Sequence, residues 1–231
     1  MHWHIRFIAI FFPALMAMQG YAQGTFEMVD RQKVEQLVND ASMATFYPTL
    51  LERFNAFDTT LTLSDYRLLY YGFVFQPEYL WNADQRRKEM NRAIKADQYA
   101  RVIQLADSVL RTNPVSLTAY YYRTYAMLNA DENDSACQKY IKRYTGLRNA
   151  ILSSGDGQHC NTAFKTIYLE DEDEIMFHHF EMDRPRDQFL QYSCDRFLVT
   201  PSGTYLNTEI FFDISESLLA LKKQRTSGRT K

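Results

Sequence analysis

The sequence predicts an α+β protein, with antiparallel helix pairs in its N-terminal part followed by a small antiparallel β-sheet. Apolar residues recur at helical spacing from Arg31 to about Ile151, and a glycine-containing break follows at 153–157. The segments after the break are short and rich in aromatic and β-branched residues. We therefore expect a leader over 1–22, a helical region over 23–152, a sheet region over 153–221 packed on the helices, and a flexible tail over 222–231.

The leader has the features of a secretory signal peptide. Arg6 precedes an apolar run from Phe7 to Met18, and the small residues Gly20 and Ala22 stand where a signal peptidase reads the chain. The run is about a dozen residues long, whereas a bilayer-spanning helix takes about twenty. We expect cleavage, a periplasmic or secreted protein, and no stable membrane anchor.

Three helices are predicted at the start of the helical region. Apolar stripes at Val34, Leu37 and Val38, and then at Leu50, Leu51, Phe54 and Phe57, predict the first two. Ser64 is expected to cap the third helix, and Pro77 to mark its end.

The clearest helical period runs from Tyr99 to Leu110, with Val102, Ile103 and Ala106 on one face. Asn113-Pro114 is expected to close this helix and to cap the next, because proline suits a first helical turn and asparagine accepts backbone hydrogen bonds. Two further helices are predicted over 117–128 and 136–151.

This part of the chain resembles a tetratricopeptide unit over about residues 97 to 151. The resemblance rests on Tyr99, Ala106, the turn Asn113-Pro114, and Tyr121 and Ala126 on the second helix. It implies paired antiparallel helices and a surface for a protein partner.

Strands are predicted over 163–169, 188–192, 196–200 and 205–214, separated by turn formers such as Pro201-Ser202-Gly203. A short helix is expected over Asp173 to Phe180, because acidic residues favour a helix N-terminus. The acidic run Glu170 to Glu174 is interpreted as a solvated turn before this helix rather than as a Ca²⁺ site.

The charge balance argues against a nucleic-acid partner. The formal net charge is −2, and removal of the leader, whose only charged side chain is Arg6, takes it to about −3. Binding to phosphates requires a clustered basic surface. The sequence specifies no oligomeric state.

Neither a metal site nor a cofactor is predicted. His159-Cys160, His178-His179 and Cys194 match no zinc-ligand spacing. The three cysteines are interpreted first as small buried hydrophobic side chains, with a Cys160–Cys194 disulfide as the alternative and Cys137 outside it.

Candidate ligand-binding residues lie in two places. Gly155, Asp156, Gly157 and His159 stand at the seam between the helical and sheet regions, where clefts often form, although a hinge is the simpler interpretation. Tyr121 and Tyr122 belong to a tyrosine run that covers most of a helix circumference, so at least one ring is expected at the surface.

Four further segments carry a second resemblance: Ser64-Asp65-Tyr66, Leu69-Tyr70-Tyr71-Gly72, Ser154-Gly155-Asp156-Gly157 and Phe211-Phe212-Asp213. With the leader, they resemble an uncharacterised domain-of-unknown-function family of exported Gram-negative bacterial proteins. The resemblance implies export and the overall layout, and it implies no catalytic residues.

The leading hypothesis is an exported module that binds a protein or peptide through its helical layer. The alternative is a hydrolase-like enzyme at the seam, with Asp156, His159 and Cys160 as its reactive groups. The first hypothesis rests on the helix-pair pattern, and the second on the one loop that combines Gly, Asp, His and Cys; the sequence leaves the question of an enzyme open and favours the non-enzymatic hypothesis.

Overall fold

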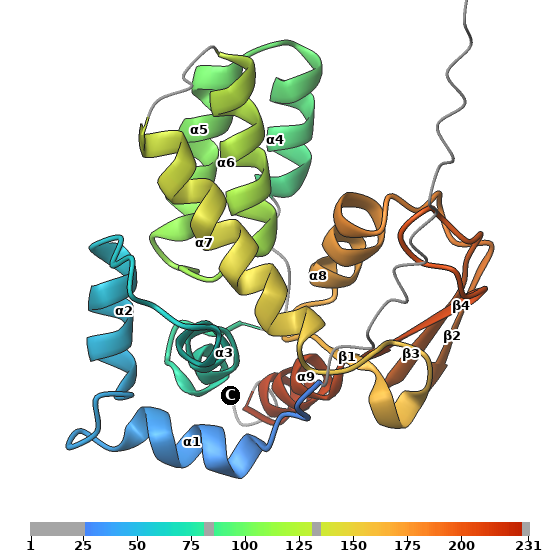
Figure 1. The fold of residues 1–231 in the computed structure, drawn as a ribbon, viewed down its shortest axis with the longest axis horizontal. Coiled ribbons are helices and arrows are strands. Elements are labelled where there is room, and N and C mark those ends of the chain that lie inside the picture. The colour runs from blue at the N-terminus through green and yellow to red at the C-terminus, as the bar shows by residue number, and fades with distance from the viewer. Residues whose placement is uncertain (1–25, 81–85, 131–134, 228–231) are drawn as a thin grey trace, which may run out of the picture.

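A computed structural model describes residues 26–80, 86–130 and 135–227, and it has the predicted α+β architecture (Figure 1). The helices are α1 (Arg31–Asn39), α2 (Tyr47–Asn55), α3 (Leu63–Gly72), α4 (Arg86–Lys95), α5 (Tyr99–Leu110), α6 (Leu117–Asn129), α7 (Ser135–Leu152), α8 (Glu170–Asp173) and α9 (Ser215–Ser227). Short turns are η1 (Phe73–Phe75) and η2 (Cys160–Thr162), and η3 (Glu174–His179) is a π-helix. The strands are β1 (Phe164–Lys165), β2 (Asp187–Gln191), β3 (Cys194–Leu198) and β4 (Glu209–Asp213).

The helical layer has two groups joined by α7. Helices α4, α5 and α6 lie side by side, α1 to α3 form the other group, and α7 runs from the first group toward the sheet (Figure 1). Every helix predicted between Arg31 and Ile151 is present.

Two predicted caps were wrong by two or three residues. Thr62, not Ser64, caps α3, because the Thr62 hydroxyl accepts from the Asp65 amide while the Asp65 carboxylate accepts from the Thr62 amide. Ser116, not Asn113, caps α6. The Asn113 side chain instead accepts from the Val115 amide, and Pro114 lies in the turn before the helix.

The sheet is mixed rather than purely antiparallel, which corrects the prediction. Its order is β1-β4-β3-β2: β2 and β3 form a hairpin, β3 and β4 are antiparallel, and β1 is parallel to β4. A parallel pair needs a long connection, and the segment containing α8, η3, β2 and β3 supplies it.

The two layers share one hydrophobic core. Its fully buried side chains come from α2 (Phe54), α3 (Tyr70), α6 (Tyr120), α7 (Leu147) and β4 (Phe212). A second cluster lies among α4, α5 and α6. The aromatic composition of the chain is therefore mostly used for packing.

The C-terminal helix α9 was not predicted. It extends through Ser227, into the segment for which a flexible tail is predicted. The leader over 1–22 lies outside the described residues. Within the described ranges, no helix combines the length and apolar character that a bilayer crossing requires.

Candidate functional site

Among the described residues, a cleft lies in the helical layer, between α2, η1, the turn after α5, and α7. Its volume is about 670 Å³. An apolar wall is formed by side chains from elements that are far apart in the sequence. These side chains include Tyr47, Leu51, Phe73, Leu110, Tyr120 and Tyr140. Clefts of about 300–1,000 Å³ that are mostly apolar with a few polar groups are typical of ligand sites.

Arg143 of α7 supplies the most unusual polar group of the cleft wall. The residue is only 7% exposed, and one of its terminal nitrogens donates to the Phe54 carbonyl. Its guanidinium carbon lies 3.4 Å from the centre of the Phe57 ring and 5.5 Å from that of Tyr140. The Arg143 Nε atom is buried and has no hydrogen-bond partner among the described residues.

A second arginine, Arg123, packs on Tyr140 of the same wall without lining the cleft itself. The Arg123 guanidinium lies 3.5 Å from the centre of the Tyr140 ring and forms a 2.7 Å ion pair with Asp107. Tyr140 is thus in contact with two arginines. The Asp107 carboxylate, which borders the cleft, is already neutralised by Arg123.

The predicted site at 155–157 is a tightly closed loop. Asp156 Oδ1 accepts from the Gln158 amide and from the Thr162 hydroxyl, and the Asp156 and Gly157 amides both donate to the Thr162 carbonyl. Gly157 has a φ of +68°, and a Cβ there would lie 2.4 Å from the Phe164 ring. Gly155 packs directly against the Thr162 carbonyl. The polar groups of this loop are therefore used in hydrogen bonds with Thr162, and its glycines pack against the segment that leads into β1.

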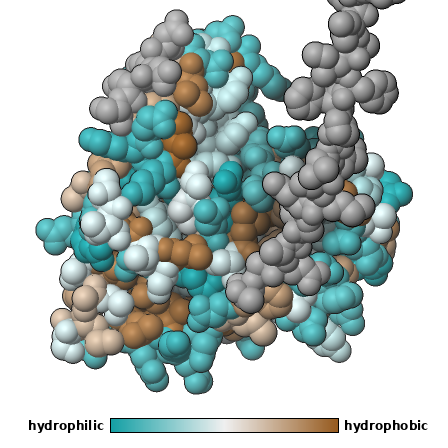
Figure 2. Space-filling model, in the orientation of Figure 1, coloured by the Kyte–Doolittle hydropathy of each residue, from teal (hydrophilic) through white to brown (hydrophobic). Residues whose placement is uncertain are grey.

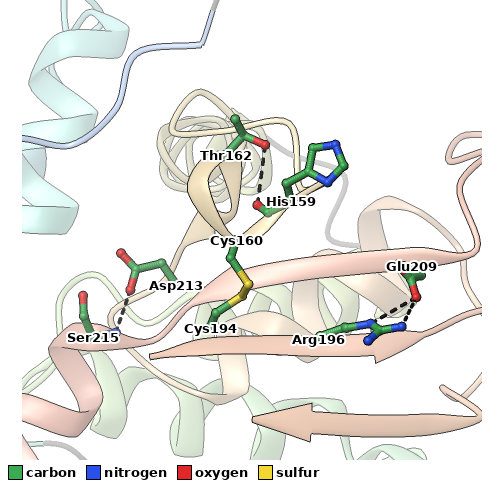
Figure 3. The surroundings of a disulfide bond; sticks show 8 residues. All are labelled: His159, Cys160, Thr162, Cys194, Arg196, Glu209, Asp213 and Ser215. Atoms are coloured by element: carbon green, nitrogen blue, oxygen red, sulfur yellow. Dashed lines mark hydrogen bonds and ion pairs between the residues drawn. A yellow bond between two sulfur atoms is a disulfide. The ribbon is translucent and has the colours of Figure 1, made fainter. Parts of the chain in front are cut away.

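A disulfide lies next to this loop. Cys160 of η2 is bonded to Cys194 of β3, so the disulfide predicted as the alternative is present and the first interpretation was wrong for these two residues. Cys137 is buried in α7. His159 is exposed and its imidazole points away from the sulfur atoms (Figure 3). Cys160 therefore presents no thiol that could act as a nucleophile.

The rings of the two candidate tyrosines touch each other edge to face, with centres 5.6 Å apart, and each also packs against other parts of the fold. Tyr122 is buried in the cluster among α4, α5 and α6. Tyr121 is half-buried and its ring stacks on His178 of η3, with ring centres 3.7 Å apart. Neither ring borders the 670 Å³ cleft. The member of the tyrosine run that borders the cleft is Tyr120.

The acidic run is buried, which overturns the prediction of a solvated turn. Glu170, Asp171, Glu172 and Glu174 are each at most 8% exposed, because α8 lies between α6 and the other elements of the core. Asp173 is more exposed and pairs with Arg87 at 2.8 Å. Local sequence pattern could not reveal this burial, since strongly charged segments normally face solvent.

Hydrogen bonds hold two of these carboxyl groups in place. The Tyr70 hydroxyl donates to Asp171, and the Thr118 hydroxyl donates to Glu174 at 3.0 Å. Burial raises the pKa of Glu174 to about 8. Burial, followed by the charge of Glu170 for Asp171 and of Asp195 for Glu172, also holds the pKa values of these two groups well above their usual range.

The π-helix η3 continues directly from the acidic turn. Its two histidines have lowered pKa values because both are partly desolvated, and Arg148 contributes to a pKa of about 4 for His179. Burial thus disfavours the charged form both of these imidazoles and of the neighbouring carboxyl groups. Among the described residues, no cluster of three or more His, Cys, Asp and Glu side chains could hold a metal ion.

Lys165 and Ser215 form an arrangement that sequence reasoning missed. The Lys165 ammonium donates to the Ser215 hydroxyl at 2.7 Å, a geometry that a serine nucleophile with a lysine base would share. However, the same ammonium lies 2.9 Å from Asp213 and 3.8 Å from Glu216. The Lys165 ammonium is therefore engaged with two carboxylates, and an ammonium group donates hydrogen bonds but accepts none.

Sequence reasoning also missed Arg143. A signal was present: Arg143 follows Tyr140 by three residues and precedes Leu147 by four, so it lies on the apolar face of its helix. Surface hydropathy gives little further help. On the face shown in Figure 2, hydrophobic residues form separate patches among hydrophilic ones.

A comparison with protein families found a match over most of the chain. The family model is described as a domain of unknown function (DUF4919), and it matches residues 32–223. No curated protein and no solved structure matches the chain.

Proposed function

The chain belongs to the DUF4919 family of domains of unknown function, and we propose that it is an exported module that binds a segment of another protein. The observation that carries this proposal is the 670 Å³ cleft between α2, η1 and α5–α7. The bound segment lies along the aromatic wall and contacts the charged groups at its ends.

The composition of the cleft supports a peptide ligand. Tyrosine and phenylalanine rings bind side chains of many shapes with little loss of their own freedom, since each ring has few rotatable bonds. Helices α5, α6 and α7 belong to the part of the chain that resembles a tetratricopeptide unit, and they provide one side of the cleft. Helical grooves of this kind suit an extended segment or a partner helix.

Two features support export. The N-terminal sequence has the pattern of a cleaved leader. The Cys160–Cys194 disulfide favours an oxidising compartment such as the periplasm or the extracellular space, because cytosolic thiols are kept reduced.

The hydrolase alternative gains no comparable support. Asp156 is engaged in its own loop, Cys160 is bonded to Cys194, and the imidazole of His159 is exposed. The enzyme hypothesis requires these groups to converge on a substrate.

A peptide-display selection tests the binding function. Random twelve-residue peptides are selected on the immobilised mature protein, and the enriched peptide is synthesised and titrated by calorimetry. We expect saturable binding. The variant Leu51→Trp, which places a large ring at the cleft wall, should weaken binding at least tenfold, equivalent to about 1.4 kcal/mol.

Leu219→Trp is the matched control because Leu219 is half-exposed on α9, outside the cleft. It should leave the dissociation constant unchanged. The proposal is abandoned if no peptide binds saturably, or if both tryptophan variants weaken binding equally.

A further inference from the structure

Arg143 carries a buried positive charge that no acidic side chain neutralises within the described residues. No carboxylate oxygen there lies within 4 Å of its guanidinium. Its contacts include the Phe54 carbonyl and the faces of Phe54, Phe57 and Tyr140, and it also interacts with the Tyr120 hydroxyl. Buried charges are rarely left without a charged partner, because ring faces return only part of the lost hydration energy.

Two acids beside the arginines of the cleft are paired with other residues, and a third, the exposed Glu78, lines the cleft next to η1. Asp107 pairs with Arg123, and Asp58 pairs with Arg53 at 2.8 Å. A further arginine, Arg111, is exposed at the rim of the same cleft. The cleft therefore has a cationic end beside an aromatic wall.

We propose that the cleft recognises a carboxylate of the bound segment, which Arg143 and Arg111 hold while the neighbouring side chain packs on Tyr120 and Tyr140. This inference rests on the proposed binding function and specifies its ligand chemistry. The guanidinium group is suited to the task, since its planar array of N–H donors matches the two oxygens of a carboxylate.

The energetic reason lies in the unpartnered Nε–H of Arg143. Removing such a donor from water without a new hydrogen bond is unfavourable, and the full positive charge adds to that cost. A ligand carboxylate in the cleft supplies the opposite charge in a partly desolvated site, where the attraction is screened less than at an open surface. A neutral ligand of the same shape does not.

Three small probes separate the possible sources of the carboxylate. N-acetyl-phenylalanine mimics a C-terminal residue, N-acetyl-aspartyl-phenylalaninamide carries its carboxylate on a side chain, and N-acetyl-phenylalaninamide is neutral. Each probe is titrated into the mature protein, and binding is followed by NMR of the arginine Nε–Hε and aromatic resonances.

We expect at least one carboxylate probe to bind five times or more tightly than the neutral amide and to shift the Arg143 signal. The tighter of the two identifies a C-terminus or an acidic side chain. Equal binding of all three probes overturns the inference but leaves the cleft as a binding site. Absence of binding by all three, together with a failed peptide selection, overturns the proposed function as well.

Arginine variants complete the test. Arg143→Gln should abolish the preference for a carboxylate, and Arg143→Lys should restore part of it. Arg143 also packs on Phe57, so its replacement can impair folding. Arg111 is exposed, and its variant Arg111→Gln therefore provides a second measurement. In that variant the preference for a carboxylate probe over the neutral amide should be at least twofold smaller than in the wild type. Arg101→Gln, exposed on α5 and outside the cleft, is the control. An unchanged preference in both the Arg143→Gln and Arg111→Gln proteins contradicts the proposal.

Discussion

The Tyr70 hydroxyl links the helical layer to the acidic turn by donating to Asp171, 101 residues later in the chain, with 2.5 Å between the oxygens. The same hydroxyl accepts from the Ile167 amide at 3.1 Å. Both side chains are almost fully buried. One phenol therefore satisfies a carboxyl group and a backbone amide at the junction of the two layers.

Tyr70→Phe should lower the free energy of unfolding by about 3 kcal/mol. The variant leaves two buried polar groups without their partner, and each such group costs about 1–3 kcal/mol. Chemical denaturation followed by far-UV circular dichroism measures the change. The control is Tyr144→Phe, since the buried Tyr144 hydroxyl has no hydrogen-bond partner among the described residues. That variant should be neutral or stabilising, and equal losses in both would refute our account of the junction.

Stability should decrease as the pH rises from about 6.5 to 8. The pKa of Glu174 is about 8 in the folded protein, against an ordinary value of 4.5, and burial also raises those of Asp171 and Glu172. In this window the unfolded chain releases protons that the folded chain retains, so rising pH favours unfolding. Below about 6.5 the two histidines, whose pKa values are lowered, act in the opposite direction.

The variant Glu174→Gln tests whether Glu174 causes this pH dependence. Its amide can still accept a hydrogen bond from Thr118 but does not titrate. The slope of the unfolding free energy against pH should therefore be smaller than in the wild type, by up to about 1.4 kcal/mol per pH unit. Denaturation curves at four or more pH values provide the slope. Glu89→Gln, at an exposed position of α4, should leave it unchanged. A wild-type stability that is flat between pH 6.5 and 8 would be incompatible with buried, protonated carboxyl groups.

Gly157→Ala should destabilise the protein by at least about 2 kcal/mol. A side chain at a φ of +68° is strained, and the new Cβ would overlap the buried Phe164 ring. At Gly203 nothing lies within 4 Å of an added Cβ, so Gly203→Ala should change stability by less than about 0.5 kcal/mol. Thermal melts of the two variants compare them directly. Similar melting temperatures would show that the 155–157 loop is not closed as described.

The disulfide makes a prediction for protein isolated from its native host. Under denaturing, non-reducing conditions iodoacetamide should modify one of the three cysteines, Cys137, and after reduction it should modify all three. Mass spectrometry counts the adducts. Reduction should also lower the unfolding free energy by about 3–4 kcal/mol, because the bond closes a loop of 34 residues. Three adducts before reduction would remove this support for an exported protein.

Local patterns predicted most of the elements. The period of Tyr99 to Leu110 reproduces α5 to the residue, and the strands β2, β3 and β4 overlap the predicted segments. The caps of α3 and α6 were misplaced because Thr62, Ser64, Asn113 and Ser116 are all good capping residues, and their competition is decided by geometry.

The sequence by itself determined most of the helical and extended segments, though not α4 or α9, since these preferences depend on the spacing of apolar residues within one element. Only the tertiary structure decided that four acids of the run (Glu170, Asp171, Glu172 and Glu174) are buried, that β1 pairs in parallel with β4, and that Arg143 and Tyr120 border one cleft. Each of these outcomes depends on groups brought together from distant parts of the chain. Their energies arise from desolvation and long-range contacts, which leave no periodic signal in the neighbouring residues.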